Sequence, residues 1–176
     1  MRKDLFSLIE ALREFNVRIS MNTNGTLITK DIAKKLKDFG IRILTISLDG
    51  ASKEVAESMR GKGSFKDNLV GIENACSQGL NVLISTTVTK CNFRDLRNIT
   101  ILGKKLGARQ VRFNHVFYGG NAVCFIKDIW LSLDEENQGL RTVEELFKEF
   151  GQFVTGSYLQ QLEIIKGLKE RGVKKR

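Results

Sequence analysis

The feature that most constrains the fold is a repeated pattern in which a helix ends and an apolar strand follows at once. Four predicted helices end at residues that tolerate the left-handed backbone conformation, namely Asn16, Gly40, Gly79 and Gly107. The strands that follow are predicted over residues 17–21, from residue 41, and over residues 80–88 and 110–117. Strands that alternate with helices run parallel and are joined by right-handed crossovers. The sequence therefore predicts an α/β fold of consecutive parallel strand-helix units.

The predicted strand that begins at residue 41 ends in a marked change of polarity. Its Ile-rich run is expected to be buried on both faces, as in a parallel sheet. Ser47 and Asp49 come where the strand would leave the sheet, Gly50 allows a tight turn, and Arg60 follows on a short predicted helix. Parallel α/β folds bind ligands at the carboxyl ends of their strands. This stretch is therefore the first candidate for a functional site.

Polar side chains also follow the other predicted strands, and parallel strands would bring them to the same edge. They are Thr23 and Asn24 after the first strand, Thr87, Thr89 and Asn92 after the third, and His115 after the fourth. Such groups suit a sugar, an amino-acid head group or an amide, and a guanidinium suits a carboxylate or a phosphate. Taken singly, each residue is explained equally well as a cap or a turn residue. Their recurrence at successive strand ends favours a site.

The formal net charge of +9 raises the possibility of nucleic-acid binding. Positive charge is concentrated in the tail from Lys166 to Arg176 and in a stretch from Leu96 to Lys127. Aromatic residues are not interleaved with these charges for base stacking, so a solvated helix face and tail are the preferred interpretation. Nucleic acid is therefore not expected to be a partner.

No apolar run approaches the ~20 residues needed to cross a bilayer, and the first residues lack the apolar core of a signal peptide. We therefore expect a cytoplasmic protein without a membrane partner. Cys76, Cys91 and Cys124 are too widely spaced for a disulfide framework or a metal knuckle, and we expect small, mostly buried thiols and no metal ligands.

Beyond Gly120 the strand-helix pattern stops. Ser132 precedes an acidic first turn, and apolar residues recur at helical spacing from Val143 to Phe153. The sequence thus predicts two parts: residues 1–120 as a partial barrel core with about four strands, and residues 121–176 as a helical extension with a basic tail.

Five short segments occur in a fixed order, and together they carry a family resemblance. They are Met21-Asn-Thr-Asn-Gly, Ile46-Ser-Leu-Asp-Gly, Arg60-Gly-Lys-Gly-Ser-Phe65, Gly79-Leu-Asn-Val and Thr87-Val-Thr-Lys-Cys-Asn92. In order and spacing, residues 1–120 resemble the radical S-adenosylmethionine (SAM) enzymes. The resemblance is to the SPASM-like branch that modifies peptides and haem precursors, often with a cysteine-rich C-terminal extension. It implies a partial TIM-type barrel whose core has six strands.

The resemblance also implies roles for the candidate residues. Thr23 and Asn24 would lie beside bound SAM, Ser47 would hydrogen-bond its ribose or amino-acid part, and Arg60 would face its carboxylate. Asp49 belongs to the same cofactor-binding set, and His115 falls on the strand expected near the adenine. Thr87, Thr89 and Asn92 fall on the substrate side.

One defining feature of the resembled family is missing from this sequence. The Cys-x-x-x-Cys-x-x-Cys loop that holds a [4Fe-4S] cluster is absent, and so is the Gly-Gly-Glu strand that follows it. The chain would therefore correspond to strands three to six, as a fragment or a split-gene product that depends on a missing N-terminal segment or a partner chain. The complete enzyme would use the cluster to cleave SAM to a 5′-deoxyadenosyl radical and modify a peptide or a haem or cofactor precursor. This chain by itself is expected to be inactive.

Two further expectations follow. The strand over residues 17–21 would present an unpaired apolar edge, so self-association is expected. The alternative from another functional class is a non-catalytic binding or scaffold module whose basic surface meets nucleic acid or a partner subunit. An ordinary barrel lyase or aldolase is disfavoured, because no phosphate-binding glycine loop and no lysine at a strand end is evident.

Overall fold

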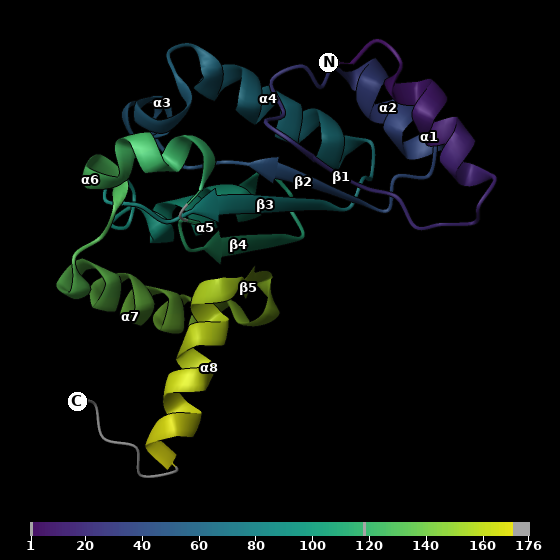
Figure 1. Ribbon diagram of the computed structural model, residues 1–176. Coiled ribbons are helices and arrows are strands. Elements are labelled where there is room, and N and C mark those ends of the chain that lie inside the picture. Colours follow the sequence, from purple (N-terminus) through teal and green to yellow (C-terminus); the bar gives the residue numbers. More distant parts are fainter. Residues whose placement is uncertain (1, 118, 171–176) are drawn as a thin grey trace.

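The computed structural model describes residues 2–117 and 119–170 (Figure 1). Its strands are β1 (Ser20–Thr23), β2 (Ile43–Ser47), β3 (Val82–Thr87), β4 (Gln110–Asn114) and β5 (Val154–Thr155). Its α-helices are α1 (Leu5–Arg13), α2 (Lys30–Asp38), α3 (Lys53–Arg60), α4 (Ser64–Ser77), α5 (Leu96–Lys105), α6 (Ile126–Ile129), α7 (Leu133–Phe150) and α8 (Ser157–Glu170). Short 3-10 helices, η1 (Gly120–Phe125) and η2 (Gly151–Phe153), precede α6 and β5.

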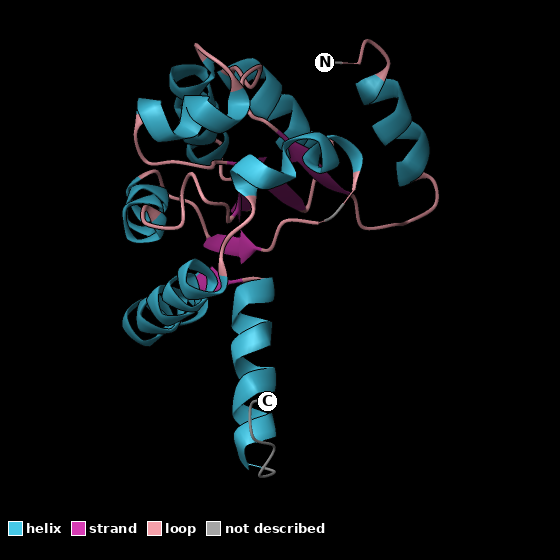
Figure 2. Cartoon of the chain, turned by 60° about the vertical axis from the view of Figure 1, so that its left-hand side comes forward, coloured by secondary structure: helices cyan, strands magenta, loops and turns pink. Residues whose placement is uncertain are grey.

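The five strands form one sheet in the order β1-β2-β3-β4-β5, and every neighbouring pair is parallel. A parallel sheet with sequential strand order is the arrangement of a partial TIM-type barrel, and it confirms the predicted fold class. All carboxyl ends of the strands therefore meet at one edge. Helix α8 projects away from the sheet in both views (Figures 1 and 2).

The core lies between the sheet and the helices that cover it. In β2, Leu44 and Ile46 are fully buried, whereas Thr45 and Ser47 on the opposite face are only partly buried. The expectation that this strand is buried on both faces is therefore wrong for the face that carries Thr45 and Ser47, because helices cover only the other side of it in the described part of the chain. The residues on the helix-facing side pack against Leu36, Ile72 and Ile99, which are also inaccessible to solvent. Burial of this apolar face is the main force that holds the strands in register.

The residues that end the helices explain why the predicted strands lie close to the observed ones. Asn16, Gly40, Gly79 and Gly107 all have a positive φ, as the predicted helix stops require. Thr29 caps α2 by accepting a hydrogen bond from the amide of Ile32. In α4 the cap position is occupied by Gly63, and the Ser64 hydroxyl donates to the carbonyl of Gly61.

The C-terminal part contains one strand that the sequence pattern does not predict. Helix α7 begins at the predicted cap, where Ser132 and Glu135 form a capping box. After α7 the chain turns through η2 and adds β5 to the sheet beside β4. The sheet therefore has five strands instead of about four. The predicted basic tail from residue 171 lies outside the described residues.

No helix in the described part of the chain combines the length and the apolar character that spanning a bilayer requires.

Candidate functional site

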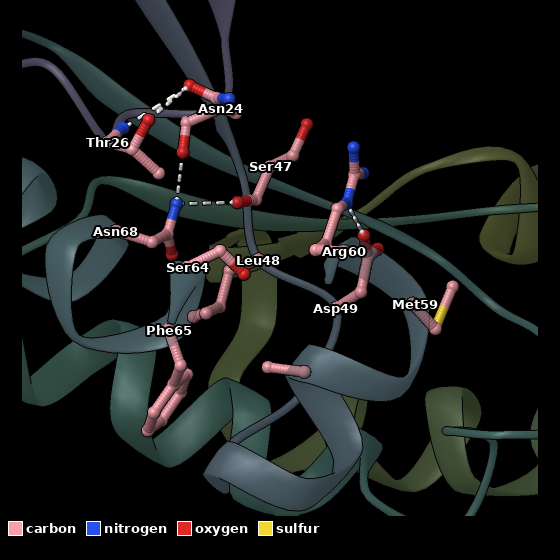
Figure 3. A pocket seen from close by; sticks show the side chains of 11 residues that line it. Asn24, Thr26, Ser47, Leu48, Asp49, Met59, Arg60, Ser64, Phe65 and Asn68 are labelled. Carbon is pink, nitrogen blue, oxygen red and sulfur yellow. Dashed lines mark hydrogen bonds and ion pairs between the residues drawn. The ribbon is translucent and has the colours of Figure 1, made fainter. Parts of the chain in front are cut away.

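A cavity of about 260 Å³ with mixed polar and apolar lining lies at the carboxyl ends of β1 and β2, where α3 and α4 close it (Figure 3). Four of the predicted site residues line it: Asn24, Ser47, Asp49 and Arg60. The remaining lining residues are Thr26, Leu48, Ala56, Met59, Ser64, Phe65 and Asn68. The structure thus brings together side chains from two strand ends and one helix end, as the parallel topology predicts. We call this cavity the first cavity.

The end of β1 is shaped by hydrogen bonds within its own turn. The Thr23 hydroxyl accepts from the amide of Gly25 at 3.1 Å, so Thr23 stabilises the turn and is not among the residues that line the cavity. The Asn24 side-chain oxygen accepts from the amide and the hydroxyl of Thr26 at 3.3 and 3.1 Å. These bonds fix the direction in which the Asn24 side chain leaves the sheet.

Asp49 anchors the cavity wall. Its side chain is completely buried; one oxygen accepts from the amide of Thr87 at 2.9 Å, and the other accepts from Nε of Arg60 at 2.5 Å. Both carboxylate oxygens are therefore used by the protein itself. The two terminal nitrogens of Arg60 and the hydroxyl of Ser47 make no hydrogen bond to other described residues, and the Arg60 side chain is 42% exposed. Asp49 holds the guanidinium in place, and Arg60 and Ser47 present the free donors.

A second cavity, of about 690 Å³, adjoins the first and shares Asp49, Met59 and Arg60 with it. Thr87 and Thr89 lie on one wall, together with Cys91. The segment after β4, η1 and α6 contribute mainly apolar residues, together with the carboxylate of Asp128: Val116, Phe117, Ala122, Phe125, Asp128 and Ile129. Two of the three predicted substrate-side residues therefore share a cavity.

The third predicted substrate-side residue, Asn92, has a structural role in this arrangement. It is 1% exposed, its amide nitrogen donates to the carbonyls of Asp49 and Thr87 at 2.9 Å each, and its oxygen accepts from the amide of Thr89 at 2.8 Å. Asn92 lines none of the three cavities. Its hydrogen bonds instead hold the ends of β2 and β3 together.

His115 does not join the other predicted residues. It lines a third cavity of about 310 Å³, where Nδ1 lies 2.8 Å from the Ser157 hydroxyl and Nε2 lies 2.9 Å from a carboxylate oxygen of Glu136. The ring stacks on Tyr158 at a centroid distance of 4.0 Å, and the Tyr158 hydroxyl donates to the other Glu136 oxygen at 2.8 Å. These side chains, which we call the His115 cluster, join the end of β4 to α7 and α8.

The His115 cluster perturbs the acidity of its members. Burial raises the pKa of Tyr158, and the carboxylate of Glu136 raises it further. Burial also pushes the pKa of Glu136 upward, but the hydrogen bonds from His115 and Tyr158 outweigh burial, and the pKa lies below its ordinary value. Glu136 is therefore a stable carboxylate at neutral pH.

Asn68 is a cavity residue that the sequence reasoning missed. It lies on the inner face of α4, between Phe65 and Ile72, in a stripe that is otherwise apolar. A polar residue on an apolar helix face is unusual unless its side chain has buried partners. That interruption of the stripe is the signal that could have identified it.

The described residues contain no group of three or more His, Cys, Asp or Glu side chains that could hold a metal ion. Cys91 and Cys124 are exposed and Cys76 is partly buried, so the expectation of three mostly buried thiols is wrong. Cys91 lies in the turn after β3 and Cys124 in η1. Burial raises the pKa of Cys76 to about 11, which makes it a poor thiolate.

Comparison with known proteins identifies the family. Residues 1–99 match the radical SAM superfamily. The chain is 36% identical over 146 residues to the Fe-coproporphyrin III synthase of Methanosarcina barkeri, which covers 82% of this chain and 36% of that protein. It is 35% identical over 138 residues to the mycofactocin maturase MftC of Mycolicibacterium smegmatis, which covers 78% of this chain and 35% of that protein. The chain thus spans about a third of the length of these curated relatives.

Solved structures agree on the fold. Native anSMEcpe with bound AdoMet superposes with a TM-score of 0.70 at 21% identity, covering 89% of this chain and 46% of that one. Streptococcus suis SuiB bound to the precursor peptide SuiA superposes with a TM-score of 0.68 at 13% identity, covering 88% of this chain and 35% of that one. Enzymes of the radical SAM superfamily use S-adenosylmethionine and a [4Fe-4S] cluster. Because the match to the family covers more than half of its length, this chain belongs to the radical SAM superfamily.

Proposed function

We propose that this chain forms one wall of the SAM site of a radical SAM enzyme that modifies a peptide or a haem precursor. The observation that carries the proposal is the first cavity, where Ser47 and Arg60 offer free donors at the carboxyl edge of a parallel sheet. The similarity to a Fe-coproporphyrin III synthase and to a mycofactocin maturase supports the two substrate classes.

The residues of the first cavity suit the chemistry of SAM. Its methionyl carboxylate matches the two terminal nitrogens of Arg60, because a guanidinium binds a carboxylate through two parallel hydrogen bonds. Its ribose hydroxyls match the short polar side chains of Asn24 and Ser47. Leu48, Met59 and Phe65 supply apolar contact surface in the same cavity. In an enzyme that also holds the cluster, SAM bound by these residues would supply the radical for hydrogen-atom abstraction.

The cluster does not fit the residues described here, because no set of three potential ligands occurs among them. In our proposal the cluster ligands come from another part of a longer protein or from a partner chain, and this chain alone is inactive.

The second cavity is the proposed place of the substrate. It adjoins the first through Met59 and Arg60, so a substrate there would lie next to SAM. Its lining combines the hydroxyls of Thr87 and Thr89 with apolar side chains from η1 and α6 and the carboxylate of Asp128, which suits a mixed polar and apolar molecule.

Titration of the ¹⁵N-labelled chain with SAM, followed by NMR, tests the SAM proposal even if binding is weak. We expect shifts of the amides of residues 24–26, 47–50 and 59–60 at millimolar SAM. Arg60→Ala should weaken SAM binding about tenfold, because it removes the carboxylate partner. It should leave the affinity for 5′-methylthioadenosine, which has no carboxylate, nearly unchanged.

Arg97→Ala is the matched control. Arg97 forms an exposed ion pair with Glu149 at 2.6 Å and lines none of the three cavities, so its removal should not change either affinity. Shifts confined to other surfaces, or equal weakening by the two arginine variants, would refute the proposed function.

A further inference from the structure

Asn68 connects the two strand ends that form the first cavity. Its amide nitrogen donates to the carbonyl of Asn24 and, at 2.9 Å, to the carbonyl of Ser47 (Figure 3). Asn68 is 7% exposed, so water competes little for these bonds. One side chain of α4 therefore bridges the end of β1 and the end of β2.

The chemistry of the two partners fixes the orientation of the Asn68 amide. Both partners are carbonyl oxygens, which only accept, so the nitrogen and its two hydrogens must face them. The Asn68 oxygen is then buried without a hydrogen-bond partner among the described residues. A buried acceptor without a partner is energetically unfavourable. Here the same side chain donates two hydrogen bonds to the backbone of proposed SAM-binding residues.

Close backbone packing makes the bridge possible. A Cβ atom built on Gly71 would lie 2.0 Å from the carbonyl oxygen of Gly25, so α4 approaches the turn after β1 more closely than any side chain at residue 71 allows. Asn68 lies one turn earlier on the same helix. The short side chain of Asn68 therefore reaches both strand ends.

The neighbouring strand pair is held differently. The ends of β2 and β3 are joined by several side chains: the Thr86 hydroxyl donates to the carbonyl of Leu48 at 2.6 Å, Asp49 accepts from Thr87, and Asn92 donates to both strands. Between the ends of β1 and β2, the side-chain hydrogen bonds found in the described residues come from Asn68. The backbone ladder joins β1 to β2 as far as the Thr23–Ile46 pair, and Asn68 joins the residues that follow.

We infer that Asn68 is a positioning residue for SAM, which sets the separation of Asn24 and Ser47 without contacting the reacting atoms. The inference rests on the proposed function. Two adjacent ribose hydroxyls can be bound together only if their partners are held at a fixed separation, and Asn68 fixes the backbone on which both partners stand.

The test compares Asn68→Leu with Asn74→Leu. Asn74 lies on the same helix, and its amide nitrogen also donates to a backbone carbonyl, that of Ile28 at 2.9 Å, but it does not line the first cavity. In Asn68→Leu without ligand, hydrogen exchange of the amides of residues 25–26 and 48–51 should accelerate about tenfold or more. Asn74→Leu should not change exchange at these positions.

SAM titrations of the same proteins provide the second readout. Asn68→Leu should weaken SAM and 5′-methylthioadenosine to the same extent, by about fivefold or more, because both carry the ribose. Arg60→Ala weakens SAM alone, so the two losses have different signatures. Asn68→Ser, which keeps at most one of the two bonds, should be intermediate, and it replaces Asn68→Leu if that variant does not fold.

The outcomes separate the two claims. Unchanged exchange at both strand ends in Asn68→Leu and Asn68→Ser overturns the inference, whatever SAM does. Faster exchange with unchanged nucleoside affinity overturns the positioning role and leaves the proposed function standing. If the wild-type chain shows no SAM shifts, the proposed function fails, and the exchange data still decide whether Asn68 holds the strand ends.

Discussion

The first cavity and the His115 cluster are both polar, and both lie where strands of the same sheet end, but they use their polar groups differently. In the His115 cluster, His115, Glu136 and Tyr158 bond to one another and to Ser157, so their hydrogen-bonding capacity is spent inside the protein. In the first cavity, Asp49 is spent in this way, but it holds Arg60 with two nitrogens free. The difference teaches how to interpret a polar cluster. Donors without a partner in the protein favour a ligand site, whereas a cluster whose groups all bond to one another favours a structural role.

Removal of Asp49 should have the largest effect on stability, because its buried carboxylate joins Arg60 to the end of β3. Asp49→Ala leaves the amide of Thr87 without its acceptor and releases Arg60. We expect the free energy of unfolding to fall by about 3 kcal/mol, measured by urea denaturation. Asp49→Asn keeps an acceptor for Thr87 and should lose roughly half as much. Equal losses in the two variants would show that the ion pair, and not the Thr87 bond, dominates.

Tyr158→Phe tests whether the His115 cluster is a joint alone. The substitution removes the hydrogen bond to Glu136 but keeps the ring that stacks on His115. The free energy of unfolding should fall by about 1–2 kcal/mol, because a bond to a charged acceptor is lost. SAM affinity in the NMR titration should not change. A weaker affinity would remove the contrast between the two regions.

The pH dependence of stability should show the smallest effect. Since the pKa of Glu136 in the folded protein lies below its ordinary value of 4.5, its carboxylate stabilises the fold above that pH. This contribution is lost as the pH falls through the lower, folded-state pKa. Glu136→Gln should therefore reduce the slope of unfolding free energy against pH in this acidic range. A slope equal to that of the wild type would mean that Glu136 is not coupled to folding.

Much of the fold could be predicted because local rules decide it. A positive φ at Gly40, Gly79 and Gly107 ends one helix and begins the next strand, and those glycines are visible in the sequence. The fifth strand could not be predicted in this way. It has two residues, Val154 and Thr155, directly after a helical apolar stripe, and so short a segment shows no alternation.

The site was predictable to the level of a shared edge, but not to the level of roles. The residue types and the parallel order brought Asn24, Ser47, Asp49 and Arg60 to one cavity. Sequence could not show that Asp49 is fully used by its neighbours, or that His115 turns toward α7 and α8. Those distinctions depend on contacts between residues far apart in the chain, which periodicity and spacing do not report.

The contact between Gly71 and Gly25 has a consequence for how sequence can vary in this protein. Where a helix packs directly on the backbone of a turn, the helix residue at the contact has room only for hydrogen atoms on its Cα. Even a methyl group there would force the helix and the turn apart. Alanine at residue 71 would tilt the amino-terminal half of α4 away from the sheet and pull its amide bridge out of reach. An exchange one helical turn from Asn68 would thus weaken the proposed SAM site without changing any side chain that lines it.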